Sequence, residues 1–353
     1  MVAKYRKIAD DLRGKILGGL YEEGTSIPTE QMLQNDYQVS RHTVRQAISL
    51  LVNEGLLVSE RGSGTFVAER ANRVEEEHEK TITVGVLLTS LSDYIFPEII
   101  SGIEKTLREN NCSLILSSSN NDFEQEKECL LSLQNQGIDA LIMEPAKSNC
   151  YNPNISEYLR IREAGIPLIF INSRIDLIDI PTVSLDDISS SQYLTEALFE
   201  RNLEKIAIVT NWDFKQGKDR LEGFIKAHLQ SDKLFSNEDV FCFNHSNRDI
   251  VINSVINYLE RTAEVDALIC YNDELAIDLI RLLTQTCPDL IERLTIASFD
   301  YSQLGKSYPI ALSAEHPKYV LGEKVVQIIL EKLKGTDDKE ISTYLFQPKI
   351  IIK

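Results

Sequence analysis

The sequence predicts a two-lobed α/β domain built on parallel sheets, preceded by a small domain of three helices and a β-hairpin. Three features of the 353 residues predict this arrangement. Apolar residues recur at helical spacing in residues 1–70, which end in a glycine-rich hairpin. Residues 71–80 are rich in glutamate without an apolar period, and residues 81–353 alternate short apolar runs with helical intervals. We therefore expect a domain over 1–70, a charged linker over 71–80 and a second domain over 81–353.

The first domain is predicted to contain a helix-turn-helix. Its first helix has roughly fifteen residues of amphipathic pattern and ends at Gly18. Thr29 can cap a second helix, and Ser40 can cap a third helix that Gly55 ends. Because only a few residues separate the second helix from the third, the two should meet at a tight turn.

A β-hairpin follows the third helix. Leu56–Ser59 and Thr65–Val67 are typical of short strands, and the glycine-rich segment 60–64 can turn between them. A helix-turn-helix followed by such a hairpin is a winged helix-turn-helix domain, which binds DNA. The whole chain has 37 Lys and Arg against 54 Asp and Glu, a net charge of −17. Any contact with double-stranded DNA must therefore be local to this domain.

Polar and basic residues crowd the start of the third helix. Guanidinium groups there can reach guanine O6 and N7, and hydroxyls or helix-end amides can hold phosphate. Lys4 in the first helix and Arg61 in the hairpin can contact the DNA backbone or minor groove. The candidate reading residues in the third helix are Ser40, Arg41, His42, Thr43 and Arg45.

Four runs in this domain resemble the winged helix of the GntR family of bacterial repressors: Ile27–Glu30, Val39–Arg45, Gly55–Leu57 and Gly62–Val67. The family often has an arginine where this chain has Gln31. By position, the resemblance implies DNA contacts from Gln31, Ser40, Arg41, His42, Arg45, Arg61 and Gly62.

Seven short apolar runs predict buried strands in the second domain. They alternate with helical intervals, which is typical of βαβ units on parallel sheets. So many strands fit two lobes better than one small sheet, and ligands of such sheets bind beyond the carboxyl ends of the strands. The runs are Ile82–Leu88, Ser113–Leu116, Ala140–Met143, Pro167–Ile171, Lys205–Val209, Asp266–Cys270 and Leu294–Ser298.

Polar and aromatic residues follow these strands. Planar hydrogen-bonding groups beside aromatic rings suit a neutral polyhydroxy ligand such as a sugar. Two alternatives remain open: Asp187 and Asp273 can simply cap helices, and Phe96 and Trp212 can belong to the core. The residues at the strand exits include Tyr94, Phe96, Glu144, Lys147, Asn172, Trp212, Asn272 and Asp300.

Four motifs resemble the periplasmic-binding-protein-like ligand domain of LacI-type repressors: Asp186-Asp187, Arg220–Phe224, Tyr271–Ala276 and Ser298–Asp300. The resemblance implies that Arg220, Asn272 and Asp300 reach the ligand. The chain departs from that family in two ways. Ser190-Ser191 stand where paired glycines are usual, and no LacI-type helix-turn-helix or hinge helix precedes the domain.

A GntR-type head on a LacI-type body resembles the arabinose-responsive repressors of bacterial sugar catabolism. Ser92–Pro97, Glu144-Pro145, Lys147-Ser148 and His316–Lys318 carry this resemblance. It implies a homodimer that represses by binding operator DNA and is released by a small sugar, L-arabinose. The residues themselves indicate only a small polar ligand, so another pentose, a nucleoside or a purine stays open. The implied effector-binding residues are Tyr94, Phe96, Glu144, Lys147, Asp186, Trp212, Arg220, Asn272, Asp300 and His316.

The sequence favours a regulator over an enzyme. It has no phosphate-binding loop, dinucleotide fingerprint or nucleophile elbow. Its six cysteines are at least 17 residues apart and its five histidines form no metal-spaced pair, so we expect no cofactor and no metal. The enzyme alternative, a GntR-type head on an aminotransferase, has only Lys147 as a rough candidate for the pyridoxal-binding lysine. Without an apolar run of membrane length or a signal peptide, we expect the chain in the cytoplasm.

Overall fold

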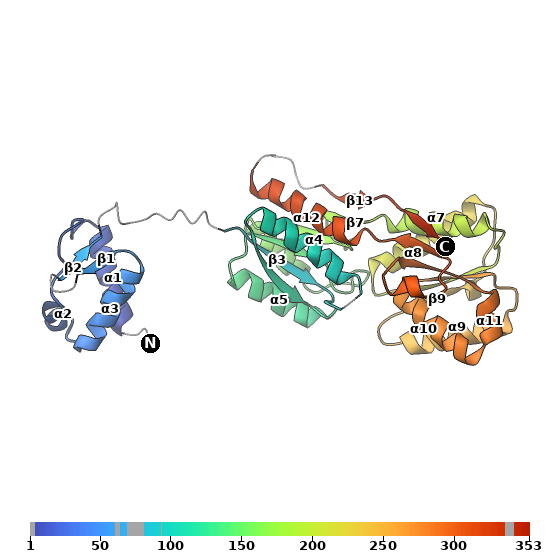
Figure 1. The fold of residues 1–353 in the computed structure, drawn as a ribbon, viewed down its shortest axis with the longest axis horizontal. Helices are drawn as coiled ribbons and strands as arrows, with labels where there is room; N and C mark the ends of the chain where they lie inside the picture. The colour runs from blue at the N-terminus through green and yellow to red at the C-terminus, as the bar shows by residue number, and fades with distance from the viewer. Residues whose placement is uncertain (1–3, 61–63, 69–80, 93, 336–341) are drawn as a thin grey trace. The chain divides into compact units, whose positions relative to one another are not determined.

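The computed structural model describes residues 4–60, 64–68, 81–92, 94–335 and 342–353. The chain forms two compact units, Met1–Thr81 and Ile82–Lys353 (Figure 1). The predicted charged linker over 71–80 lies outside the described residues. Within the described parts, every helix is too short or too polar to span a lipid bilayer.

The first unit contains the predicted helix-turn-helix and hairpin. Each helix contributes a buried leucine to one small core: Leu12, Leu33 and Leu51. The two strands pair in antiparallel register. The elements are α1 (Lys4–Leu17), α2 (Glu30–Tyr37), α3 (Arg41–Asn53), β1 (Leu57–Glu60) and β2 (Gly64–Val67).

Local caps fix the turn between α2 and α3. The Thr29 hydroxyl accepts a hydrogen bond from the Met32 amide at 3.3 Å, and the Ser40 hydroxyl accepts one from the Thr43 amide at 3.3 Å. Gln38, with φ 50°, turns the chain after α2. The two predicted caps are therefore confirmed, and they set the direction in which α3 leaves the turn.

The second unit begins with a lobe built on a six-stranded sheet in the order β13-β7-β6-β5-β3-β4. All neighbouring strands in this sheet are parallel. The elements of this first lobe are β3 (Thr83–Leu88), α4 (Phe96–Glu109), β4 (Ser113–Ser118), α5 (Phe123–Asn135), β5 (Ala140–Met143), α6 (Ile155–Glu163), β6 (Leu168–Ile171), β7 (Thr182–Leu185), α12 (Lys318–Leu333) and β13 (Tyr344–Phe346).

The second lobe repeats this plan with the strand order β14-β12-β11-β10-β8-β9. Only β14 runs antiparallel to its neighbour among the described strands of this sheet. The elements are α7 (Asp187–Phe199), β8 (Ile206–Asn211), α8 (Lys215–Gln230), η1 (Asn237–Asp239), β9 (Val240–Phe243), α9 (Arg248–Arg261), β10 (Ala267–Cys270), α10 (Asp273–Thr286), α11 (Pro288–Arg293), β11 (Thr295–Asp300), η2 (Gly305–Ser307), β12 (Leu312–Glu315) and β14 (Ile350–Ile352).

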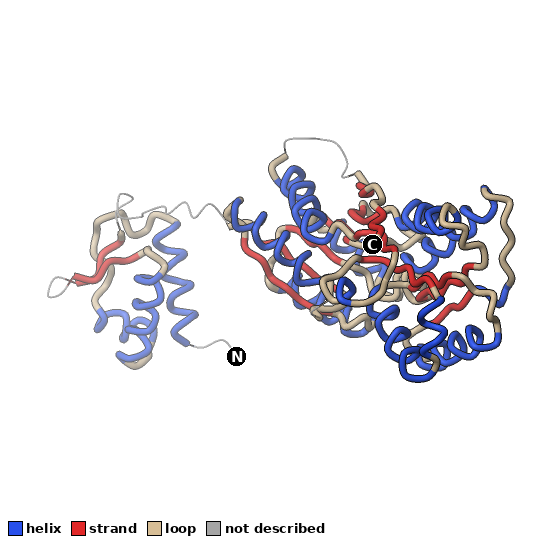
Figure 2. Tube along the Cα trace, turned by 45° about the vertical axis from the view of Figure 1, so that its right-hand side comes forward, coloured by secondary structure: helices blue, strands red, loops and turns tan. Residues whose placement is uncertain are grey.

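Helices cover both faces of each sheet (Figure 2). In the first lobe, α4 and α12 bury one face and α5 and α6 bury the other. In the second lobe, α9 to α11 cover one face and α7 and α8 the other. Central strands such as β5, β6 and β10 are buried at every residue, which explains their continuous apolar sequence. The predicted two-lobed α/β fold is confirmed.

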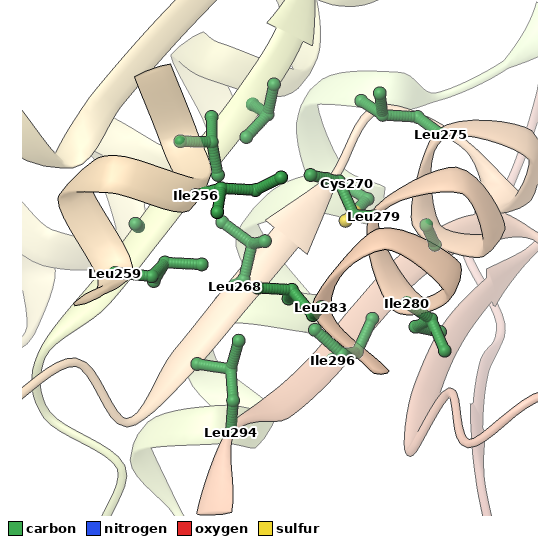
Figure 3. Packing of buried hydrophobic residues seen from close by; sticks show 14 of the residues in the cluster. Ile256, Leu259, Leu268, Cys270, Leu275, Leu279, Ile280, Leu283, Leu294 and Ile296 are labelled. Carbon is green, nitrogen blue, oxygen red and sulfur yellow. The ribbon is translucent and has the colours of Figure 1, made fainter. Parts of the chain in front are cut away.

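The core beside β10 illustrates how the strands and helices interlock (Figure 3). Leu268 and Cys270 of β10 point toward α9 and α10, where Leu259 and Leu279 are fully buried. This packing fixes the carboxyl end of β10 and the helix that follows it. The residues at that end therefore occupy defined positions.

Five short strands were not among the seven predicted: β7, β9, β12, β13 and β14. Each has three or four residues. Ser184 in β7 and Ser313 in β12 interrupt the apolar pattern, and β9, β13 and β14 lie at sheet edges. The serines explain why β7 and β12 were missed, whereas β9, β13 and β14 are wholly apolar and are missed because three or four residues are too few to give a periodic signal.

The chain passes between the two lobes three times, after β7, after β12 and between β13 and β14. After the second passage, α12 packs against α4 of the first lobe, as Figure 1 shows. Gly102 and Gly322 permit this close approach, because a Cβ atom at Gly322 would collide with the carbonyl oxygen of Ile99, and one at Gly102 with that of Tyr319. α12 is therefore held firmly on the first lobe.

We predict that Gly322→Ala destabilises the second unit by about 1–3 kcal/mol, because the added methyl group overpacks the α4–α12 contact. Thermal unfolding should show a Tm lower by several degrees. Gln327→Ala places the same residue at an exposed position of the same helix and should change stability by less than about 0.5 kcal/mol. Equal Tm values for the two variants would contradict the close contact.

Candidate DNA interface and effector cavity

The N-terminal turn of α3 carries the predicted DNA-reading side chains. Arg41 and Arg45 lie four residues apart on one face, and their side chains are 64% and 59% exposed. His42 is also exposed, and the Ser40 hydroxyl lies 2.9 Å from that of Thr43. This end of the helix therefore offers two guanidinium groups, an imidazole and hydroxyls to a ligand.

Glu30 at the start of α2 orients both arginines. Its carboxylate accepts hydrogen bonds from Arg41 Nε at 2.7 Å and Arg45 Nε at 2.9 Å. The bonds from Arg45 and Arg41 hold the pKa of Glu30 below its usual range. Since both bonds use Nε, the terminal nitrogens of each guanidinium keep their donors for guanine. The sequence did not single out Glu30, although an acidic residue in the first turn of α2 is a detectable signal.

The remaining predicted DNA contacts are placed only in part. Gln31 is exposed on α2, next to Glu30. Lys4 is the first residue of α1, where only its backbone is described. Arg61 and Gly62 lie outside the described residues. The described interface thus consists of the N-terminal turns of α2 and α3.

A cavity of about 270 Å³ lies between the two lobes, at the carboxyl ends of their strands. This is where parallel α/β sheets bind ligands, and the volume suits a small molecule. The residues lining the cavity are Thr89, Ser90, Tyr94, Ile95, Phe96, Asn121, Glu144, Asn172, Asp187, Asn211, Asp213, Phe214, Gln216, Arg220, Phe243, His245, Arg248, Tyr271, Asn272, Glu274, Leu275, Asp300 and His316.

Most of the predicted effector residues come together here. Those lining the cavity are Tyr94, Phe96, Glu144, Arg220, Asn272, Asp300 and His316. They come from four strand exits, from α8 and from the second passage between the lobes. Asn272 also caps α10 by accepting a hydrogen bond from the Leu275 amide, so one side chain serves both purposes.

Lys147, Asp186 and Trp212 do not line the cavity. The Lys147 ammonium lies over the Phe123 ring, 5.1 Å from its centroid. Asp186 caps α7 by accepting hydrogen bonds from the amide and hydroxyl of Ser189, and its neighbour Asp187 lines the cavity instead. The Trp212 side chain is 45% exposed. The predicted effector residue Asp186 is therefore wrong, and Asp187 lines the cavity instead.

Arg220 is the centre of the polar wall. Its Nε donates to Asp187 at 2.8 Å, its Nη1 to the Tyr271 carbonyl oxygen, and its Nη2 lies 3.8 Å from Asp300. The guanidinium also stacks 4.2 Å from the centroid of the Phe299 ring. Because Asp187 already balances its charge, Arg220 offers a hydrogen-bond donor rather than a free positive charge.

Tyr94 connects the two lobes across the cavity. Its hydroxyl donates to Asp300 Oδ2 at 2.6 Å and accepts from the Asp273 amide at 3.1 Å. Burial and the negative charge of Asp300 raise the pKa of Tyr94, so it stays a neutral donor. A second bridge joins the lobes where the Lys215 amide donates to the Ser148 hydroxyl at 2.9 Å. The lobes are therefore in contact on both sides of the cavity.

Several buried polar atoms in the cavity wall have no hydrogen-bond partner within the described part of the chain. They are Asn172 Oδ1 and Nδ2, Gln216 Oε1 and His316 Nδ1. Buried donors and acceptors are normally paired, and an unpaired one is costly. These atoms come from both lobes and from the passage between them, so a ligand rich in hydroxyl groups would satisfy them together.

Burial shifts the titration of two cavity residues in opposite directions. It raises the pKa of Asp187 to about 6, although the Arg220 guanidinium acts against this shift. It lowers the pKa of His316 to about 4, so the imidazole is neutral at pH 7. Carboxylates, amides and a neutral imidazole favour an uncharged polyhydroxy ligand over an anionic one. No group of three metal-ligating side chains occurs among the described residues.

The cavity residues that the sequence missed follow strands as well. Asn121 comes after β4, whose exit was not among the predicted ligand contacts, and Phe243 ends β9, which was not predicted. Gln216 lies one turn before Arg220 on α8, so helical spacing from that residue would have found it.

Comparison with known proteins identifies both domains. Residues 4–67 match the bacterial regulatory proteins of the gntR family, and residues 81–347 match the periplasmic binding proteins and sugar binding domain of the LacI family. The chain is 34% identical to the arabinose metabolism transcriptional repressor of Geobacillus stearothermophilus, over 99% of this chain and 96% of the relative. It is 32% identical to the protein of the same description from Halalkalibacterium halodurans, over 100% of this chain and 96% of the relative.

The crystal structure of transcription regulator CcpA of Lactococcus lactis superposes with a TM-score of 0.65 at 19% identity, covering 77% of this chain and 97% of that one, which shows the fold. A winged helix and a sugar-binding domain define a sugar-responsive transcriptional regulator. The chain belongs to the family of GntR-headed transcriptional repressors with a LacI-type effector domain. Members of this family are regulators and not enzymes, in agreement with the sequence prediction.

We predict that His316→Gln reduces the sensitivity of folding to acid. In the folded chain His316 stays neutral down to about pH 4, whereas in the unfolded chain it gains a proton below about pH 6.5. The stability that depends on neutral His316 is therefore complete above pH 6.5 and is lost as the pH falls toward 4, by about 2 kcal/mol at pH 5. Between pH 7.5 and 5 the Tm of the variant should fall less than that of the wild type. Equal slopes would contradict the burial of a neutral imidazole.

Proposed function

We propose that the protein is a homodimeric, cytoplasmic repressor of arabinose metabolism that binds operator DNA and is released by L-arabinose. The observation that carries this proposal is the identity of 34% and 32% with two arabinose metabolism repressors over essentially the whole chain. The small cavity with unpaired acceptors for hydroxyl groups supports a sugar of this size. The proposed operator contacts are those of α2, α3 and the hairpin, and the predicted linker over 71–80 joins the two domains.

The proposed mechanism has two states. A dimer presents two α3 helices about 34 Å apart to a near-palindromic operator, and repression follows from occupation of that site. L-arabinose binds between the lobes and favours a state whose heads no longer match the half-sites. For an ordinary allosteric protein the coupling free energy is about 1–3 kcal/mol.

Calorimetry separates L-arabinose from the alternatives that the residues leave open. Wild-type protein should be titrated with L-arabinose, a second pentose, a nucleoside and a purine. We expect heat of binding from L-arabinose, and binding of another compound in its place would overturn the proposed effector. Analytical ultracentrifugation of the same sample tests the dimer.

We predict that Arg45→Ala abolishes operator preference, because the terminal guanidinium nitrogens of this residue read a base edge. Loss of one bidentate contact costs about 1–3 kcal/mol of discrimination. The measurement is a gel shift with operator and scrambled DNA. Arg160→Ala, which removes an exposed arginine from α6, is the matched control and should bind like the wild type. Retained discrimination by Arg45→Ala would contradict the proposed reading role.

We predict that Asp300→Ala binds operator normally but is not released by L-arabinose. Removing this carboxylate leaves a sugar hydroxyl unpaired in a buried site, at a cost of about 1–3 kcal/mol. Release is measured by fluorescence anisotropy of labelled operator during a sugar titration. Asp249→Ala removes a carboxylate that is 94% exposed and should release like the wild type. Normal release by Asp300→Ala would contradict its place in the effector site.

A further inference from the structure

The backbone that carries the Asp300 carboxylate has an unusual conformation. Asp300 has φ 88° and Tyr301 has φ 46°, both in the region that residues other than glycine rarely adopt. The two residues follow one another at the carboxyl end of β11, where Asp300 enters the cavity. Such a conformation persists only where neighbouring groups hold it in place.

Lys318 is the charged group among those that hold this backbone; the His316 amide also donates to the Asp300 carbonyl oxygen at 3.4 Å, and the Tyr301 amide donates to the Ser313 hydroxyl at 3.1 Å. The Lys318 ammonium donates hydrogen bonds to the carbonyl oxygen of Asp300 at 2.5 Å and, at 3.4 Å each, to those of Tyr301 and His316. The residue is only 6% exposed. A buried ammonium is usually paired with a carboxylate, yet Lys318 forms no ion pair with another described residue. Its charge is instead satisfied by the backbone carbonyls of the effector residue Asp300, of Tyr301 and of His316.

Lys318 also connects the two lobes. It is the first residue of α12, which the contacts of Gly102 and Gly322 hold against α4 of the first lobe. Asp300 ends β11, a strand of the second lobe. A change in the position of Asp300 would therefore alter the hydrogen bonds of the Lys318 side chain and so act on the start of α12.

We propose that Lys318 is a positioning residue of the effector site: it fixes the Asp300 carboxylate for the ligand and transmits its position to α12 and the first lobe. The proposal rests on the proposed function in one respect, that a ligand in this cavity contacts Asp300. It assigns Lys318 no contact with the ligand itself, since Lys318 does not line the cavity.

The test is a double-mutant cycle on L-arabinose affinity, measured by calorimetry with Lys318→Met, Asp300→Ala and the double variant. Lys318→Met should weaken binding at least about tenfold, because Asp300 loses charge-assisted bonds to its backbone. In the Asp300→Ala background the same change should cost less than about twofold, since the group that Lys318 positions is absent. Lys318→Arg should restore part of the affinity, because a guanidinium can also donate to carbonyl oxygens.

Lys332→Met, an exposed lysine on the same helix, is the control for charge and should bind like the wild type. Wild-type affinity in Lys318→Met, or a loss that multiplies fully with that of Asp300→Ala, would overturn the proposal. Thermal unfolding verifies that the second unit of each variant, which contains Lys318 and Asp300, is folded. If Lys318→Met does not fold, the cycle is completed with Lys318→Arg, whose loss of affinity must likewise vanish in the Asp300→Ala background. If the wild type binds another compound instead of L-arabinose, the proposed effector fails, and the same cycle with that compound still tests Lys318.

Discussion

The effector site depends on the contacts that the Asp300 carboxylate makes with side chains of both lobes. Its carboxylate receives the Tyr94 hydroxyl from the first lobe and lies beside the Arg220 guanidinium of the second. The burial of these groups strengthens each polar contact among them and makes each unpaired buried group costly. The neutral His316 and the Asp187–Arg220 pair follow from the same burial. The wall carries more carboxylates than guanidinium groups, so it disfavours an anionic ligand and favours a neutral one that contributes hydroxyl groups.

The chain passes between the lobes three times, so a ligand that contacts both lobes at Asp300 can affect how they are arranged. The lobes are separately packed α/β layers with their own cores, so they can move relative to each other as bodies. A ligand that touches both lobes changes the balance between their arrangements by its differential affinity alone. In the first unit, Glu30 has a comparable role, because its ion pairs orient Arg41 and Arg45 in the absence of DNA. Both sites thus hold their side chains ready for a ligand.

Sequence patterns predicted the elements whose periodicity is strong and missed those whose signal is weak. Ser40 and Thr29 cap helices as expected, because capping depends on adjacent residues. The short strands β7 and β12 were missed since serines interrupt them. Cavity residues were found where they end or directly follow a strongly apolar strand, as Asp300 and Glu144 do. The prediction placed Asp186 in the effector site, whereas Asp186 caps α7 and the next residue, Asp187, lines the cavity. The sequence could not separate the two, because neither composition nor spacing distinguishes a helix cap from the adjacent side chain. The partners of Lys318 are distant along the chain and only the fold brings them together.

The central claim is that ligand binding between the lobes and operator binding by the head are coupled. The most direct test is to measure whether each ligand changes the affinity for the other by the same factor. Operator affinity should be measured with and without saturating L-arabinose, and L-arabinose affinity with and without saturating operator. Linkage requires that both ratios be the same number, and ordinary allostery places it at about 5–150-fold. The account predicts equal ratios in this range, with each ligand weakening the other. Ratios of one in both directions, with both ligands bound, would contradict it.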